Sequence, residues 1–150
     1  MLFGIAAASI AAQAQARPAL QPAAILTVIS GDVLMRTARG EFSPASDGAV
    51  LYAGTMLRTS ADARALITLF EGSTMELDPA SDITIEAGSR DGSTIAHALG
   101  RSWNVVMRLT TADSRYEPTT PAATASVRGG DFAITASDAA SDLTTTGTTE

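Results

Sequence analysis

The chain has 150 residues, of which 45% are hydrophobic and 17% charged, so it is long enough for one domain with its own core. Its formal net charge of -6 at pH 7 opposes binding to nucleic acids, whose phosphates attract mainly basic residues. Cysteine is absent, which excludes disulfides, thiolate catalysis and cysteine-ligated metal centres. We therefore expect no nucleic-acid partner.

The N-terminal segment, residues 1–16, reads "MLFGIAAASIAAQAQA" and is an apolar run that ends in two Ala-Gln-Ala triplets. This pattern is typical of a secretory signal peptide, and the run is shorter than the roughly 20 residues of a membrane span. No Lys or Arg precedes it, so the true start lies upstream or the signal is degenerate; a buried N-terminal helix is the alternative. We predict cleavage after Ala14 or Ala16, a periplasmic or secreted bacterial protein, and no membrane span in the mature chain.

The first strands follow a proline-bearing linker, "RPALQPAA", at residues 17–24. "ILTVISGDVLMR" predicts two strands on either side of Gly31 and Asp32, and "GAVLYAGTMLRTS" predicts two more around Ala53 and Gly54. These segments open a predicted β-domain that covers residues 25–135.

The segment "ARALITLFEGSTMELDP" predicts a hairpin with a two-residue turn at Glu71 and Gly72, where glycine supplies the positive φ. Pairing of Phe70 with Ser73 would define the two faces of this hairpin. The face expected in the core holds Leu66, Thr68, Phe70, Ser73, Met75 and Leu77. The face expected to be only partly covered holds Ala65, Ile67, Leu69, Thr74, Glu76 and Asp78.

The later segments are also short. "SDITIEAG" predicts a strand with Ile83 and Ile85 on one face, "RDGSTIAHALG" a helical turn, "SWNVVMRLT" a strand and "TASVRGGDFAIT" a pair of strands. Residues 136–150 are rich in threonine and predict a polar tail or an incomplete final hairpin. Many short strands predict one all-β domain, mostly antiparallel, arranged as a sandwich, a roll or a solenoid.

Candidate catalytic residues are few. His97 is the single histidine and has no second histidine at a metal-binding spacing, so we expect a loop or surface residue. The carboxylates are dispersed, and acids at turns are usually solvated. No serine lies in a G-x-S-x-G motif, and "VRGGD" lacks the lysine of a phosphate-binding loop. We predict a protein that is not an enzyme and has no metal or other cofactor.

The ordered motifs from Ile25 to Ile134 resemble the FecR domain family. The matching segments are Gly31 with Val33, "LYAGTMLRTS", "ADARALITLFEGSTMELDPASDITI" and "TTPAATASVRGGDFAI". The chain differs from the family at Thr55 and Glu71, where the family often has Asp, and at Gly130, where it usually has Thr. The resemblance implies an all-β fold. The structural positions that it implies are Gly31, Gly54, Gly72, Pro121, Val127, Arg128, Gly129 and Phe132.

The last motif has specific expected roles. Pro121 is expected at a strand start or an edge because it cannot donate a backbone hydrogen bond. Val127 and Phe132 are expected in the core, and Gly129 with Gly130 in a turn or bulge that needs positive φ. Arg128 is expected to pair with an acid, and anion binding is the alternative.

FecR regulators relay a signal from an outer-membrane transporter to a sigma factor, and this chain looks like an exported, stand-alone form of their periplasmic domain. We predict a non-enzymatic domain that binds a protein or a cell-envelope polymer in a sensory or scaffolding role. Trp103, Tyr52 and Tyr116 are the candidate recognition residues, although core packing is favoured for Trp103. Two alternatives remain: the sensor part of an anti-sigma regulator whose N-terminal region is missing, and a carbohydrate-active enzyme with two converging carboxylates.

Overall fold

The computed structural model describes residues 21–109 and 113–137, and the backbone pairing of 141–145. These residues form β-strands and no helix. The strands are β1 (Pro22–Ser30), β2 (Val33–Arg36), β3 (Ser43–Pro44), β4 (Val50–Tyr52), β5 (Met56–Thr59), β6 (Arg64–Leu69), β7 (Thr74–Leu77), β8 (Asp82–Ser89), β9 (Gly92–Val106), β10 (Arg115–Thr119), β11 (Gly130–Ala136) and β12 (Ser141–Thr145). The predicted signal peptide at residues 1–16 lies outside the described residues.

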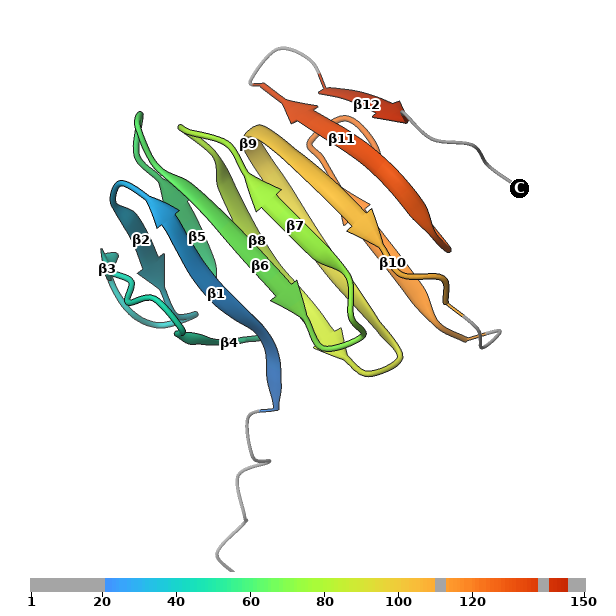
Figure 1. Ribbon diagram of the computed structural model, residues 1–150, viewed down its shortest axis with the longest axis horizontal. Coiled ribbons are helices and arrows are strands. Elements are labelled where there is room, and N and C mark those ends of the chain that lie inside the picture. The colour runs from blue at the N-terminus through green and yellow to red at the C-terminus, as the bar shows by residue number, and fades with distance from the viewer. Residues whose placement is uncertain (1–20, 110–112, 138–140, 146–150) are drawn as a thin grey trace, which may run out of the picture.

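The strands form one continuous, curled sheet in the order β3-β2-β5-β8-β9-β7-β6-β1-β4, with β10 and β11 also paired to β9 and β12 paired to β11. Every pair is antiparallel except β9 with β10. Because the sheet curls, β2, β5 and β8 lie behind β1, β6 and β7 (Figure 1). The prediction of an all-β domain of short, mostly antiparallel strands is confirmed.

Strand β9 connects the front and the rear of the curled sheet. Its first half pairs with β8 and β10, and its second half pairs with β7 and β11. Between the halves, Gly100 has a φ of +92°, and a Cβ at this position would lie 2.5 Å from the Cα of Ser81. Only glycine fits that conformation at that distance. The strand therefore passes from one part of the sheet to the other at Gly100.

The predicted helical turn in "RDGSTIAHALG" is wrong, because this segment is the turn into β9 and the first half of that strand. Ser93, Ile95 and His97 alternate toward the core and are all buried. A period of two is the signature of a strand, and the small and polar residues between these positions concealed it in the sequence. His97, expected in a loop or on the surface, is instead fully buried.

The core lies between the front and rear strands. Its largest fully buried side chains are Tyr116, Phe132, Leu26, Leu51, Leu57, Ile67, Leu69, Met75, Leu77, Ile83, Ile85 and Ile95. Ile83 and Ile85 of β8 are therefore buried as predicted. The two sides approach closely where Gly88 of β8 meets Ala23 of β1, since a Cβ on that glycine would lie 2.6 Å from the Cβ of Ala23.

The hairpin of β6 and β7 exists, but its predicted register is wrong by one residue. Ile67 pairs with Met75, and the amide of Leu69 donates to the carbonyl of Ser73, so the loop has three residues rather than two. Gly72 takes the positive φ of +99° that such a loop requires. The shift buries Ala65, Ile67 and Leu69 and leaves Phe70 44% exposed.

The tail prediction needs a similar correction. Residues 141–145 form β12, which pairs with β11 in regular antiparallel register from Phe132–Thr145 to Ala136–Ser141. The final hairpin therefore has a second strand. The polar composition of this segment suits an edge strand, because one of its hydrogen-bonding edges pairs with no described strand.

Ala80, in the turn between β7 and β8, has a φ of +53°. An L-residue is strained in this left-handed region, so Ala80→Gly is expected to stabilise the protein by about 1 kcal/mol. The same change at Ala53, an exposed turn residue without positive φ, should destabilise it by about 0.5 kcal/mol through backbone entropy. Thermal unfolding of the two variants checks this prediction, and a lower melting temperature for Ala80→Gly would contradict it.

Candidate functional site

The second half of β9 orients its side chains in the reverse of the usual pattern. Ser102 and Asn104 point into the core and are fully buried, whereas Trp103 and Val105 point outward with exposures of 38% and 36%. A strand with one solvated face normally buries its apolar residues and exposes its polar ones. Both halves of this inversion therefore call for a physical reason, one inside the core and one on the surface.

The outward side chains belong to a larger surface that mixes apolar, threonine and charged side chains, which we call the outer face. Directly paired residues of antiparallel strands share a side of the sheet, so two rows can be traced across the front strands. The first row is Val50, Ile25, Thr68, Thr74 and Val105, and the second is Thr27, Leu66, Glu76 and Trp103. At the end of the first row, Phe70 and Met107 are 44% and 55% exposed. Large apolar side chains exposed on several neighbouring strands make this surface a candidate interaction site.

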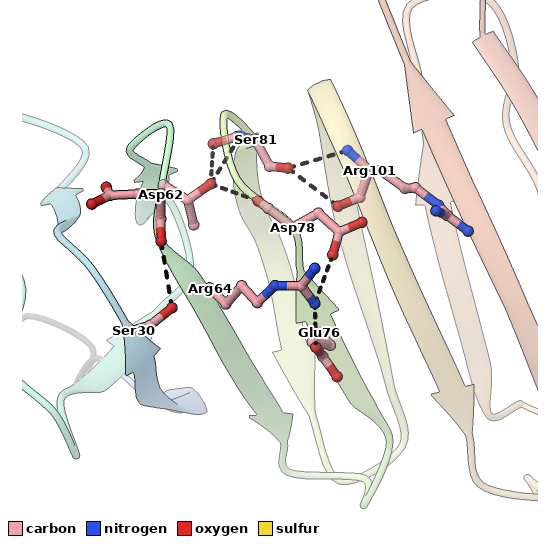
Figure 2. Close-up of polar contacts among 8 residues, drawn as sticks. Ser30, Asp62, Arg64, Glu76, Asp78, Ser81 and Arg101 are labelled. Atoms are coloured by element: carbon pink, nitrogen blue, oxygen red, sulfur yellow. Dashed lines mark hydrogen bonds and ion pairs between the residues drawn. The ribbon is translucent and has the colours of Figure 1, made fainter.

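A charged cluster begins within the second row of the outer face, at Glu76, and extends to its border. Arg64 of β6 lies 3.3 Å from Oε1 of Glu76 and 3.3 Å from Oδ1 of Asp78, and all three side chains are partly exposed. Figure 2 shows this cluster, with Arg101 of β9 beside it. Such exposed ion pairs contribute little to stability, and charges at the rim of an interface act mainly on specificity and association rate.

Inside the core, the polar residues of β9 are held in a hydrogen-bonded network. The Tyr116 hydroxyl donates to Oδ1 of Asn104 at 2.7 Å, and Nδ2 of Asn104 donates to Oγ of Ser102 at 3.0 Å. Oγ of Ser102 lies 3.5 Å from Nδ1 of His97. Buried polar groups are tolerated when they are paired in this way, and the network thus accounts for the inward half of the inversion.

His97 ends this network. Burial lowers the pKa of His97 to about 4, so the imidazole is neutral near pH 7. Its Nε2 atom is buried and has no hydrogen-bond partner among the described residues. A neutral histidine buried in a core and surrounded by strands is a packing residue and gives no sign of metal binding. No group of three or more His, Asp or Glu comes together as a metal site in the part of the chain that the structure describes.

Glu71, expected as a solvated turn acid, is folded toward the interior. Its Oε2 atom accepts a hydrogen bond of 2.7 Å from Oγ of Ser93, on the first half of β9. Burial raises the pKa of the Glu71 carboxyl, and hydrogen bonds from Ser93, its own amide and Ser73 oppose that rise. Burial, assisted by the charge of Glu71, also raises the pKa of Tyr116.

Of the three candidate recognition residues, only Trp103 lies on the outer face. Tyr52 is half-buried on the short strand β4. Tyr116 is fully buried, so the expectation that it forms part of a recognition surface is wrong. The structure thus does not bring the three aromatic side chains together. It also corrects the preference for core packing at Trp103, which is 38% exposed.

Comparison with protein families gives one match, because residues 55–147 fit the family described as FecR protein. This match covers more than half of the chain. The chain belongs to the FecR family. FecR proteins are regulatory rather than enzymatic, and membership points to a sensor or signal-relay role in anti-sigma regulation. Comparison with curated proteins and with solved structures gives no significant match.

The FecR match starts at residue 55 and extends through β12, so Gly31 and Gly54 precede it. Gly31 and Gly54 both have positive φ, at +67° and +87°, as turns between strands require. A Cβ on Gly31 would also lie 2.6 Å from the Cα of Ala63. These two glycines shape the part of the domain that precedes the matched residues.

The last FecR motif lies between β10 and β11. Pro121 is exposed and follows Thr120 in a turn closed by hydrogen bonds between Thr120 and Ala123, so it does not start a strand as predicted. Proline suits the second position of such a turn. Val127 is half-buried against the core and bridges to Tyr116, rather than belonging to a full strand.

The rest of that motif leads into β11. Phe132 is 2% exposed, and its ring meets that of Tyr116 edge to face at 6.0 Å. Gly130 has a φ of +114°, and the carbonyl of Arg128 accepts a hydrogen bond from the amide of Leu109. The Arg128 side chain is exposed, and its predicted ion pair stays a prediction. Gly129, next to it, has a φ of +157°.

Apart from Glu71, the acids of this FecR protein in the part of the chain that the structure describes lie in ion pairs or at exposed positions. Asp82 pairs with Arg58 at 2.7 Å, and Glu76 and Asp78 share Arg64. Within the described ranges, the exposed acids are Asp32, Glu41, Asp47, Asp62, Glu86, Asp91, Asp113 and Asp131. A glycosidase needs two carboxylates facing each other across the scissile bond, so this arrangement lends no support to a carbohydrate-active enzyme. Among the described residues, no helix has the length and hydropathy to cross a bilayer.

Proposed function

We propose that this chain is an exported, non-enzymatic FecR domain that takes part in signal relay by binding a protein partner through the outer face. The observation that carries the proposal is the inverted second half of β9, where Trp103 and Val105 point outward while Ser102 and Asn104 are buried. An apolar residue that points outward gains less from folding than one buried in the core. It gains when a partner removes it from water.

The export part of the proposal rests on the apolar N-terminal run and its Ala-Gln-Ala triplets, which resemble a secretory signal. FecR membership supports a regulatory role in the bacterial envelope. A protein partner is favoured over an envelope polymer because the outer face exposes large apolar side chains from several strands, with charged side chains next to them. Such a composition, an apolar centre with a polar rim, is that of protein interfaces.

The test compares full-length variants in the recovery of a partner from an envelope extract. Trp103→Ser and Val105→Ser are expected to reduce recovery of one defined protein about tenfold or more, because truncating a central aromatic side chain of an interface costs about 2 kcal/mol. Leu99→Ser is the matched control, since Leu99 is also on β9 and 41% exposed but lies in its first half, off the outer face. The control should bind like the wild type.

Two results would contradict the proposal. One is equal recovery of the partner by Trp103→Ser and the wild type, which would mean that the outer face does not bind the partner. The other is recovery of a polysaccharide and no protein, which would favour an envelope polymer. Circular dichroism of each variant establishes that a loss of binding does not come from unfolding.

A further inference from the structure

In the turn between β6 and β7, the side chain of Glu71 points toward the interior of the domain. Glu71 is bonded through Oε2 to Ser93, so that this turn at the front of the sheet is attached to the first half of β9 at the rear. Its other oxygen, Oε1, is buried and has no hydrogen-bond partner among the described residues. A carboxylate with an unsatisfied buried oxygen costs more free energy than a neutral carboxyl group in the same place.

The same turn supports the apolar end of the outer face. Phe70 precedes Glu71, and a Cβ on Gly72 would lie 3.3 Å from Cγ of Met107, so that side chain lies over the turn. The amide of Met107 donates to Oγ of Ser73 at 3.1 Å. Any movement of residues 70–73 therefore changes the position of both Phe70 and Met107.

We propose that Glu71 is a proton-controlled latch: the protonated carboxyl holds the β6–β7 turn against Ser93, and ionisation releases the turn together with the apolar end of the outer face. When the proton leaves, the charge stays in a partly buried site in which Ser93 donates to Oε2 and Oε1 has no hydrogen-bond partner among the described residues; burial outweighs the donors that favour the charge. Opening of the turn lets water solvate the charge, so the open state gains as the pH rises.

The sign of the pH dependence follows from the direction of the shift. Burial raises the pKa of the Glu71 carboxyl above its unfolded value of 4.5. Its contribution to the stability of the closed turn is thus complete below pH 4.5 and is lost as the pH rises through the folded pKa. His97 acts in the opposite sense, because its pKa falls from 6.5 to about 4 and its contribution is lost as the pH drops through that range.

The surroundings of Glu71 contain few other titratable groups. Tyr116 of β10 faces it from the rear and keeps its proton throughout the range, since its pKa is raised. The other charged groups on the strands near Glu71 do not face it. Arg115 and Glu117 pair with each other at 3.7 Å on the opposite side of β10. Asp91, Arg101 and Arg108 are exposed. Glu71 is therefore the group whose titration governs this turn.

Amide hydrogen exchange of residues 70–73 and Met107 in the full chain tests the latch without any partner. In the wild type, the protection factors of these amides, which are corrected for intrinsic exchange, are expected to fall between pH 5 and pH 8. The total fall should be about tenfold for each unit by which the pKa of Glu71 in the folded protein exceeds 4.5. Glu71→Gln, which keeps an acceptor for Ser93 and carries no charge, should abolish this fall. Glu76→Gln, an exposed acid on the adjacent strand, is the control and should retain it.

Carbon-13 NMR titration of the Glu71 carboxyl in the wild type requires no variant to fold. A midpoint at the ordinary value for glutamate would overturn the proposal, and so would a Glu71→Gln protein that keeps the wild-type pH profile of exchange. If amide protection in Glu76→Gln no longer depended on pH, the proposal would also be overturned, because the pH dependence of exchange would then come from the surface ion pairs. None of these results depends on whether the outer face binds a partner.

Discussion

Replacing Gly100 with alanine is expected to destabilise the domain by about 3 kcal/mol or more, enough to unfold much of a marginally stable population. Gly100 has a φ of +92°, which costs an alanine strain energy, and the added Cβ would lie 2.5 Å from the Cα of Ser81. Backbone atoms cannot move aside as a flexible side chain can. Urea denaturation followed by Trp103 fluorescence measures the loss.

Gly48→Ala separates the two contributions. Gly48 has a similar φ of +80°, but a Cβ there would meet nothing within 4 Å, so this change carries the strain without the clash and should cost about 1 kcal/mol. If both substitutions cost the same, close packing against Ser81 is unimportant and β9 can bend around a side chain at position 100.

The second large effect is expected at Phe132, where truncation to alanine should cost about 3–5 kcal/mol. The ring is 2% exposed and packs edge to face against Tyr116 at 6.0 Å, so the substitution removes an aromatic contact and leaves a cavity. Tyr116 also anchors the hydrogen-bonded network through Asn104, which loses a supporting neighbour.

Phe70→Ala is the matched comparison, since the same side chain is removed from a position that is 44% exposed. Its cost should stay below about 1 kcal/mol, as is usual for surface substitutions. Chemical denaturation of the two variants, with equal denaturant slopes, checks the difference. A loss at Phe132 no larger than that at Phe70 would place Phe132 outside the cooperative core.

The strands of this domain could be recognised in the sequence largely because its turns are marked by glycine. Gly31, Gly54 and Gly72 separate apolar segments, and each takes the positive φ that other residues avoid. Ile83 and Ile85 alternate cleanly and are buried, as a half-buried strand requires. These are local properties, and local properties are what a single sequence reports well.

The register of the β6–β7 hairpin could not be predicted in the same way. Both alternations along "ARALITLF" contain large apolar residues, with Ile67 and Leu69 on one side and Leu66 and Phe70 on the other. Their difference in burial comes from the three-residue loop and from pairing with β1 and β9. A shift of one residue exchanges the two faces of one strand relative to the other, so the error in the turn misplaced the side chains of β6, whereas Ser73, Met75 and Leu77 are buried as predicted.

The candidate site was only partly visible for a related reason. Trp103 stands out in the sequence as an aromatic residue, but its place at the start of an apolar segment favours core packing. The signal that was missed is the alternation of "SWNVV", in which polar Ser102 and Asn104 occupy one side and Trp103 and Val105 the other. Which side is buried depends on partners such as Tyr116, which is distant in sequence and offers its hydroxyl to Asn104.

The continuity of β9 also restricts how the gene for this domain can change. Deletion or insertion of one residue between Gly100 and Val106 would turn Ser102 and Asn104 outward and Trp103 and Val105 inward, since side chains alternate with a period of two. The buried network and the apolar surface would be lost in the same event. Divergence along this segment is therefore expected to proceed by substitution at constant length, whereas differences in length accumulate in loops such as that between β10 and β11.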